Sequence, residues 1–250
     1  MKHRHNIVYT SKQIADFYGN NRRKWDDFYP SERWVFERIA GEKEGLGDVL
    51  DVGCACGGLG LALQDRVPLR SYSGIDINAD AIAEARNKSK LLVPSLFIAG
   101  DILQADIQGE YDTVVSLSCA DWNIETAAII KACWDRVKTG GYFVISLRLT
   151  TGQGVNDIQR SYQQINFSGK DQTPEIANYV VFNFKEALGI MHALTPAPAL
   201  IGAYGYLGSP SSTAVTPFDA IVFAVFYVKK SANNSAHICA ELNFPLELFV

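Results

Sequence analysis

Short apolar runs alternate with segments of helical periodicity along the middle of the chain. The runs predict strands at residues 49–53, 71–77, 95–102, 111–118 and 142–149, with helices between them at 58–66, 78–92 and 125–137. Strands that alternate with helices form a mostly parallel sheet, because right-handed crossovers place the helices on both of its faces. The pattern therefore predicts an α/β domain that starts at about residue 47.

The flanks of this region have a different pattern. Residues 1–46 combine helix-spaced apolar positions with many aromatic and basic residues, and residues 150–178 are polar and predict an insertion over the sheet edge. The tail predicts a helix at 185–194 and strands at 199–206 and 218–230. We expect an N-terminal helical segment, 1–46, followed by one domain over 47–250 that carries the insertion.

The composition is that of an ordinary soluble protein. The 250 residues are 48% apolar, enough for one large core, and the formal net charge of -4 makes nucleic acid an unexpected partner. We find no export signal and no run of roughly 18 apolar residues that could span a membrane. Five cysteines in apolar contexts indicate buried thiols rather than disulfides. We therefore expect a cytoplasmic protein with no membrane partner.

A glycine-rich loop, DVGCACGG, directly follows the first predicted strand. Ligands of parallel sheets bind beyond the carboxyl ends of the strands, and Gly53 and Gly57 let the backbone turn sharply near a ligand. Asp51 lies two positions before the first glycine, where a carboxylate would repel a pyrophosphate and attract a cationic amino group. Cys54 and Cys56 lack a second ligand pair at zinc spacing, so we expect no metal. The loop predicts an organic cofactor.

Two more acids follow the next two predicted strands. Asp76 lies 19 positions after Gly57, close to the spacing of roughly 20 residues at which an acid binds a ribose. Asp101 follows the third strand, where a carboxylate can accept a hydrogen bond from an adenine amine. Asp51, Asp76 and Asp101 therefore form a line that suits an amino-acid group, a ribose and an adenine in turn.

In these features the sequence resembles the class I S-adenosylmethionine-dependent methyltransferases, over residues 47–149 and the closing strands of the tail. The resemblance implies a Rossmann-like fold, with a seven-stranded, mostly parallel sheet whose last strand, 218–230, is antiparallel. It also implies S-adenosyl-L-methionine as the cofactor. The residues expected to contact it within the domain are Asp51, Gly53, Cys54, Ala55, Gly57, Asp76, Ile77, Asp101, Ile102 and Ser118. Ala55 stands where the family has glycine, so we expect slightly different loop packing.

Aromatic and basic residues concentrate at positions 17–29. In related small-molecule methyltransferases such a segment covers the cofactor. The resemblance therefore implies that residues 1–46 form a helical lid, with Tyr18, Arg22 and Trp25 at the cofactor. The alternative is an amphipathic helix that docks on the sheet with its charges in solvent.

The residues after the fourth predicted strand are expected to face the methyl acceptor. Their sequence, SLSCADWN, lacks the Pro-Pro-aromatic motif of methyltransferases that act on DNA bases. Asp121 can serve as a general base or can cap the next helix, and Trp122 can line the pocket or pack in the core. His192, on a predicted helix, is the second candidate base.

We therefore predict an S-adenosylmethionine-dependent methyltransferase that acts on a small polar acceptor, such as a sugar or a natural-product intermediate. The alternatives are a protein or RNA methyltransferase, an NAD-dependent oxidoreductase, and a cofactor-binding module without activity. The acceptor atom, whether oxygen, nitrogen or carbon, and the oligomeric state stay open.

Overall fold

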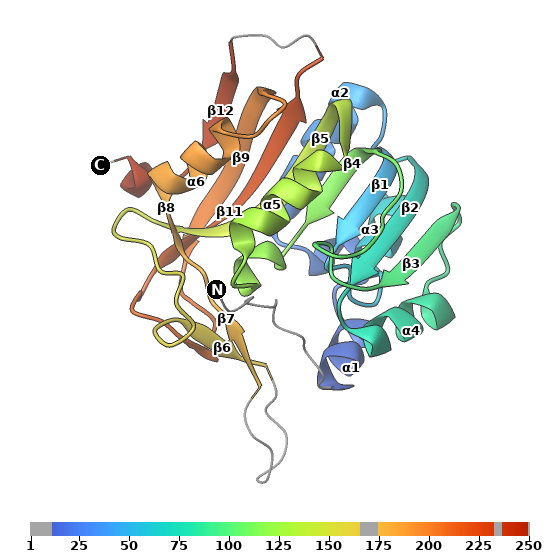
Figure 1. Cartoon of the computed structure of the whole chain (residues 1–250), viewed down its shortest axis with the longest axis horizontal. Coiled ribbons are helices and arrows are strands. Elements are labelled where there is room, and N and C mark those ends of the chain that lie inside the picture. Colours follow the sequence, from blue (N-terminus) through green and yellow to red (C-terminus); the bar gives the residue numbers. More distant parts are fainter. Residues whose placement is uncertain (1–11, 166–174, 233–236, 250) are drawn as a thin grey trace.

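The computed structural model describes residues 12–165, 175–232 and 237–249 (Figure 1). Its helices are α1 (Lys12–Asn20), α2 (Pro30–Lys43), α3 (Gly58–Gln64), α4 (Ala79–Lys88), α5 (Thr126–Asp135) and α6 (Phe184–His192), with the 3-10 turns η1 (Trp25–Asp27), η2 (Ala120–Trp122) and η3 (Leu246–Leu248). Its strands are β1 (Gly47–Val52), β2 (Leu69–Asp76), β3 (Ser95–Ala99), β4 (Tyr111–Ser116), β5 (Val137–Thr150), β6 (Tyr162–Gln164), β7 (Ile176–Asn178), β8 (Phe182–Asn183), β9 (Pro198–Gly208), β10 (Ala214–Val215), β11 (Ile221–Lys230) and β12 (Cys239–Asn243).

The main sheet confirms the predicted fold class. Its strand order is β12-β9-β11-β5-β4-β1-β2-β3, with β8 paired to β5. β1 to β5 run parallel, and β11 runs antiparallel to both β5 and β9. The sheet has nine strands, however, and not the seven expected. β8 has two residues and β12 is largely exposed, so neither carries the apolar run that would predict a strand.

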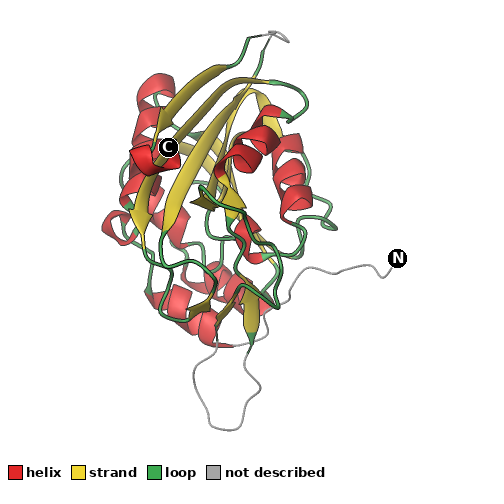
Figure 2. Ribbon diagram, turned by 90° about the vertical axis from the view of Figure 1, so that its left-hand side faces the viewer, coloured by secondary structure: helices red, strands yellow, loops and turns green. Residues whose placement is uncertain are grey.

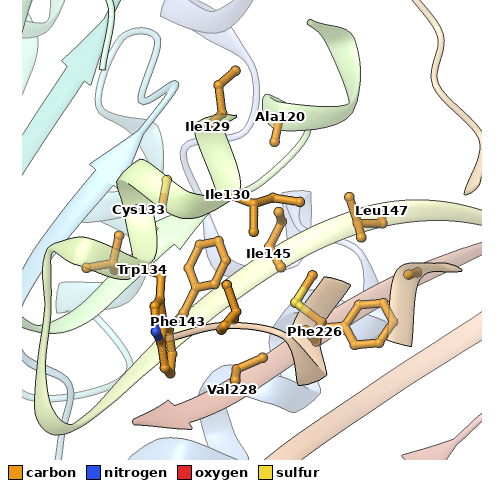
Figure 3. Packing of buried hydrophobic residues seen from close by; sticks show 14 of the residues in the cluster. Ala120, Ile129, Ile130, Cys133, Trp134, Phe143, Ile145, Leu147, Phe226 and Val228 are labelled. Atoms are coloured by element: carbon orange, nitrogen blue, oxygen red, sulfur yellow. The ribbon is translucent and has the colours of Figure 1, made fainter. Parts of the chain in front are cut away.

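Helices cover both faces of the main sheet (Figure 2). Successive strand residues point to opposite faces, so Phe143 joins one apolar cluster and Val144 joins the other. On the first face α5 packs against β5, as Trp134 beside Phe143 shows in Figure 3, and α6 lies on the same face. α2, α3 and α4 cover the second face. The faces are thus closed, and the carboxyl ends of the strands are left for a ligand.

A smaller three-stranded sheet, which we call the cap, has the order β10-β6-β7. β6 and β7 lie beyond the carboxyl ends of the main strands, at the bottom of Figure 1. They come from the predicted insertion, 150–178, whose residues 166–174 lie outside the described residues. β10 comes from the connection between β9 and β11. The cap therefore combines the insertion with a segment from the tail.

The N-terminal helices have two different positions. α2 packs on the second face of the main sheet through Val35, Phe36 and Ile39. α1 instead lies beside α4, next to the end of the sheet (Figure 1). Residues 1–11 of the predicted lid are outside the described residues, so the lid role of 1–46 stays a prediction. Within the described ranges, none of the helices has the length and apolar character needed to cross a membrane.

Candidate active site

A cavity of about 480 Å³ opens at the carboxyl ends of β1, β2 and β4. Its volume lies within the range of roughly 300 to 1,000 Å³ that is usual for small-molecule sites. The predicted residues that line it are Tyr18, Arg22, Asp51, Gly53, Cys54, Ala55, Asp76, Ile77, Asp101, Ile102 and Ser118. The other four predicted site residues, Trp25, Gly57, Asp121 and His192, are not part of its wall.

The loop after β1 reaches the cavity because its backbone passes through the left-handed region. Gly53 has a φ of 80°, and a Cβ built there would lie 2.5 Å from the Cys119 side chain, so glycine is required. Ala55 has a φ of 45°, which costs an alanine about 1 to 2 kcal/mol. Its N–H donates to Asp76 Oδ2 at 2.8 Å, and this charge-assisted bond offsets the strain. Ala55 therefore keeps the turn of a glycine loop.

Asp76, at the end of β2, has both carboxylate oxygens engaged. Oδ2 accepts the Ala55 N–H, and Oδ1 accepts the N–H of Asn78, the residue that caps α4, at 2.8 Å. Burial raises the pKa of Asp76, and the two backbone donors oppose this rise. A carboxylate oxygen can accept more than one hydrogen bond, so a ligand hydroxyl can still bind here.

Asp51, in β1, is a buried acid in the cavity wall, with 3% of its surface exposed. It accepts a hydrogen bond from the Tyr72 hydroxyl. Burial raises the pKa of Asp51 to about 7, the Tyr72 bond opposes the rise, and the nearby Asp76 adds to it. A cation close to Asp51 would favour its ionised form. The group can therefore change its charge near neutral pH.

The two cysteines of the loop are free, buried thiols. Burial raises the pKa of Cys54 well above its usual value and that of Cys56 to about 11, so both stay protonated at neutral pH. The Cys56 thiol points to the carbonyl oxygen of Ala15 in α1, 3.4 Å away. Across residues 12–165, 175–232 and 237–249, no group of three or more His, Cys, Asp or Glu side chains could hold a metal ion.

The two glycines at the start of α3 have different neighbours. A Cβ on Gly57, whose φ is 73°, would lie 2.8 Å from the Phe97 ring, so this residue serves the packing behind the wall. Gly58 lines the cavity, and a Cβ there would lie 2.1 Å from the backbone oxygen of Arg22. Gly58 therefore lets the N-terminal segment pack directly on the glycine loop.

Arg22 and Tyr18 bring the N-terminal segment into the wall. Arg22 Nη2 donates to both carboxylate oxygens of Glu32, at 2.9 and 3.0 Å, and its guanidinium lies 4.5 Å from the centre of the Phe28 ring. Burial raises the pKa of Glu32, which is 1% exposed, and Arg22 opposes the rise. Among the described residues, neither Nε nor Nη1 of Arg22 donates to a protein group, so both can bind an anion.

Trp25 does not fulfil its predicted role. Its ring packs against the apolar cluster of the second sheet face, and the Arg66 guanidinium lies 5.8 Å from the ring centre. Tyr18 and Phe28 line the cavity, whereas Trp25, the first residue of η1, does not. The aromatic residues of 17–29 therefore divide between the wall and the core.

Asp121 and His192 do not reach the cavity either. Asp121 is 3% exposed, and its Oδ2 lies 2.9 Å from Arg148 Nε. Burial raises the pKa of Asp121, and Arg148 opposes the rise. His192 is exposed at the end of α6, the helix that packs on the first sheet face. The geometry supports neither predicted base.

Most of the remaining wall consists of apolar and amide side chains. Trp122 is part of it, which was one of the two roles considered for this residue. Residues that were not predicted include Phe17, Asn21, Phe28, Leu117, Asn123, Gln163, Gln164 and Ile165. No motif marks them, and the only signal was their position in the N-terminal segment, after β4 or in the insertion.

Part of the chain is similar to known methyltransferases. Residues 49–141 match the family model described as a methyltransferase domain. The curated ubiquinone biosynthesis O-methyltransferase of Pseudomonas aeruginosa (strain LESB58) is 31% identical over 149 residues, which cover 54% of this chain and 61% of that protein. The chain thus spans less than two thirds of the length of this relative.

Solved structures share the fold at low identity. An amino pentose methyltransferase from Micromonospora echinaspora, solved with bound S-adenosylmethionine, has a TM-score of 0.52 at 16% identity, and the match covers 91% of this chain and all of that one, 100%. The [4+2]-cyclase SpnF has a TM-score of 0.53 at 14% identity, over 91% of this chain and 98% of that one. These likenesses show the fold, which hosts more than one reaction. Together with the match over residues 49–141, they confirm the predicted resemblance to the class I S-adenosylmethionine-dependent methyltransferases.

Proposed function

We propose that this protein is an S-adenosylmethionine-dependent methyltransferase that acts on a small-molecule acceptor. The observation that carries the proposal is that Asp51, Asp76 and Asp101, from the ends of three successive strands, line one cavity with the glycine loop. In this proposal Asp51 attracts the methionine amino group, Asp76 binds the ribose hydroxyls and Asp101 accepts from the adenine amine. When bound, the cofactor supplies an electrophilic sulfonium methyl group.

Arg22 complements the three acids. Glu32 holds one nitrogen of its guanidinium, and the other two nitrogens can donate to the methionine carboxylate. The Arg22 backbone packs on Gly58 in the loop, so binding of the cofactor and the position of the N-terminal segment are mechanically linked. This link supports the lid role proposed for the segment.

The rest of the wall suits a small polar acceptor without charge. Phe28 and Trp122 offer flat apolar surfaces, whereas Asn123, Gln163 and Gln164 offer both hydrogen-bond donors and acceptors. A sugar or a natural-product intermediate has this combination of properties. The names of the similar proteins, which refer to an amino pentose and to ubiquinone biosynthesis, also support a small-molecule acceptor.

The test has a binding arm and a turnover arm. Calorimetry should show that S-adenosylhomocysteine binds and that NAD does not. Transfer of a tritiated methyl group should then be measured with a panel of phenols, catechols, amino sugars and sugar alcohols, with bulk RNA and unfolded protein as comparisons. We expect transfer to at least one small molecule. Binding of S-adenosylhomocysteine without any transfer would overturn the enzymatic proposal, and transfer only to RNA or protein would overturn the acceptor class.

A further inference from the structure

Arg148 is a buried cation at the carboxyl end of β5, behind the cavity wall. Its side chain is 5% exposed, and its Nε forms an ion pair with Asp121 Oδ2 at 2.9 Å, although the two atoms are not aligned as in a hydrogen bond. Arg148 Nη2 also donates to the backbone oxygen of Asp121 at 2.8 Å. Asp121 Oδ1 has no hydrogen-bond partner among the described residues. One guanidinium therefore holds both the side chain and the backbone of η2.

The same guanidinium contacts the segment that directly follows β7 of the cap. Its Cζ lies 3.7 Å from the centre of the Tyr179 ring, a cation–π contact between two buried groups. The N–H of Val180 donates to the Asp121 backbone oxygen at 3.0 Å, so two donors share this acceptor. Tyr179 and Ser161 exchange two further hydrogen bonds, which connect this segment to the residue before β6. Arg148 is thus bound to η2 and to the cap at once.

The two parts of the chain that Arg148 joins, η2 and the cap, both contribute residues to the cavity wall. Trp122 and Asn123 follow Asp121 directly, and the Trp122 ring centre lies 5.4 Å from the Arg148 guanidinium. On the cap side, β6 carries Gln163 and Gln164 into the wall. None of these four residues belongs to the group of acids assigned to the cofactor. The ion pair therefore lies behind the two parts of the wall that are not assigned to the cofactor. We call them the η2 wall, with Trp122 and Asn123, and the cap wall, with Gln163 and Gln164.

We propose that Arg148 is a positioning residue that fixes the separation between the η2 wall and the cap wall, and so determines affinity for the acceptor. The proposal rests on the methyltransferase function. It assigns Asp121 a structural partnership with Arg148 in place of a base role. It also specifies the acceptor: a neutral molecule that reaches from the Trp122 ring to the amides of Gln163 and Gln164.

The experiment compares Arg148→Met and Arg148→Lys with Arg160→Met. Arg160 is exposed in the segment before β6, so its variant removes the same charge without touching the ion pair. The panel acceptor with the highest wild-type turnover serves as substrate. For Arg148→Met we expect the acceptor KM to rise about tenfold or more, while the KM of S-adenosylmethionine and the Kd of S-adenosylhomocysteine stay within about twofold. The acceptor KM of Arg148→Lys should lie between those of the wild type and of Arg148→Met, because an ammonium keeps the charge but not the paired donors.

Hydrogen exchange supplies a second readout that needs no acceptor. In Arg148→Met the Tyr179 and Val180 amides should lose protection, whereas the Ala55 and Asn78 amides, which Asp76 holds, should keep it. An unchanged acceptor KM with unchanged exchange would overturn the proposal, as would equal losses of acceptor and cofactor affinity. If Arg148→Met does not fold, the same measurements on Arg148→Lys decide. If no panel compound is methylated by the wild type, the function proposal fails, and the exchange data still test the coupling.

Discussion

The backbone oxygen of Arg22 occupies the space in which a side chain on Gly58 would begin, since a Cβ built on Gly58 would lie 2.1 Å from that oxygen. Arg22 itself has a φ of 55°, in the left-handed region, and Glu32 holds its guanidinium. The N-terminal segment thus meets the glycine loop through the backbone of both partners. The contact makes the shape of the loop a requirement for docking of the segment.

Gly58→Ala should therefore displace the N-terminal segment. The added methyl group would overlap a backbone atom, and such overpacking typically costs about 1 to 3 kcal/mol. We expect a lower free energy of unfolding in urea and faster hydrogen exchange at residues 15–28. Gly189→Ala is the matched control, because Gly189 lies in α6 with nothing within 4 Å of its built Cβ. This control should be stabilised by up to about 1 kcal/mol, and a similar gain in Gly58→Ala would contradict the clash.

Asp76→Ala should weaken cofactor binding strongly. The change removes the acceptor for the ribose and also releases the backbone N–H groups of Ala55 and Asn78. Loss of these charge-assisted bonds should reduce the affinity for S-adenosylhomocysteine, measured by calorimetry, by roughly 2 to 4 kcal/mol. Asp80→Ala, an exposed acid in the first turn of α4, should leave the affinity nearly unchanged. Equal affinities for the two folded variants would rule out the ribose assignment.

Asp51 should make the stability of the ligand-free protein depend on pH. Its pKa in the folded state, about 7, lies above the ordinary value of 3.8, so the folded state binds the proton more tightly than the unfolded state. The contribution of Asp51 to the free energy of unfolding is therefore present at low pH and is lost as the pH rises from about 4 to 7. Asp51→Asn mimics the neutral form. The free energy of unfolding of this variant, measured in urea, should therefore exceed that of the wild type by an amount that grows across this window, to on the order of 4 kcal/mol.

Tyr72→Phe provides the control for this pH dependence. The Tyr72 hydroxyl stabilises the ionised form of Asp51, so its removal should raise the pKa of Asp51 further. The loss of stability should still begin near pH 4, but it should extend to higher pH and become larger. A difference between Asp51→Asn and wild type that stays constant from pH 4 to 8 would show that Asp51 ionises normally.

Arg22→Met should destabilise the fold, because it leaves the Glu32 carboxylate without its partner. Glu32 is 1% exposed, and without Arg22 its carboxylate would be buried with no counter-charge, which costs about 3 kcal/mol or more. The double variant Arg22→Met/Glu32→Gln should recover most of this loss. Arg33→Met, which breaks a pair with an Asp26 side chain that is 90% exposed, should change stability by less than about 1 kcal/mol. Additive effects in the double-mutant cycle would contradict a buried pair.

The acids of the cofactor site could be predicted because each lies at or next to the carboxyl end of its strand. A strand that ends at a known residue leaves little freedom for the next side chain, and parallel strands bring their ends to one edge. Asp51, Asp76 and Asp101 therefore reach the same cavity, although they are far apart in the sequence. The strand lengths were less accurate: β5 begins at Val137 and not at residue 142, and Gly140, with a φ of 72°, lies inside this one long strand.

The acceptor side could not be predicted in the same way. The orientation of Asp121 depends on η2 and on Arg148, which is 27 positions away in the sequence. Helical periodicity located α6, but it does not tell which face of the sheet a helix covers, and His192 ends on an exposed surface. Gln163 and Gln164 enter the wall through strand pairing inside the cap, which their polar sequence does not reveal.

In the proposed function the cap lines the acceptor site, and its composition limits how acceptor preference can be re-engineered. β6 pairs with β7 on one side and with β10 on the other, where Gln163 lies opposite Ala214. A chimera that receives only residues 150–178 from a relative would pair a foreign β6 with the resident β10. Grafting should succeed only when the connection between β9 and β11 is exchanged together with the insertion. A graft of the cap therefore needs two chain segments, and these create four junctions with the rest of the protein.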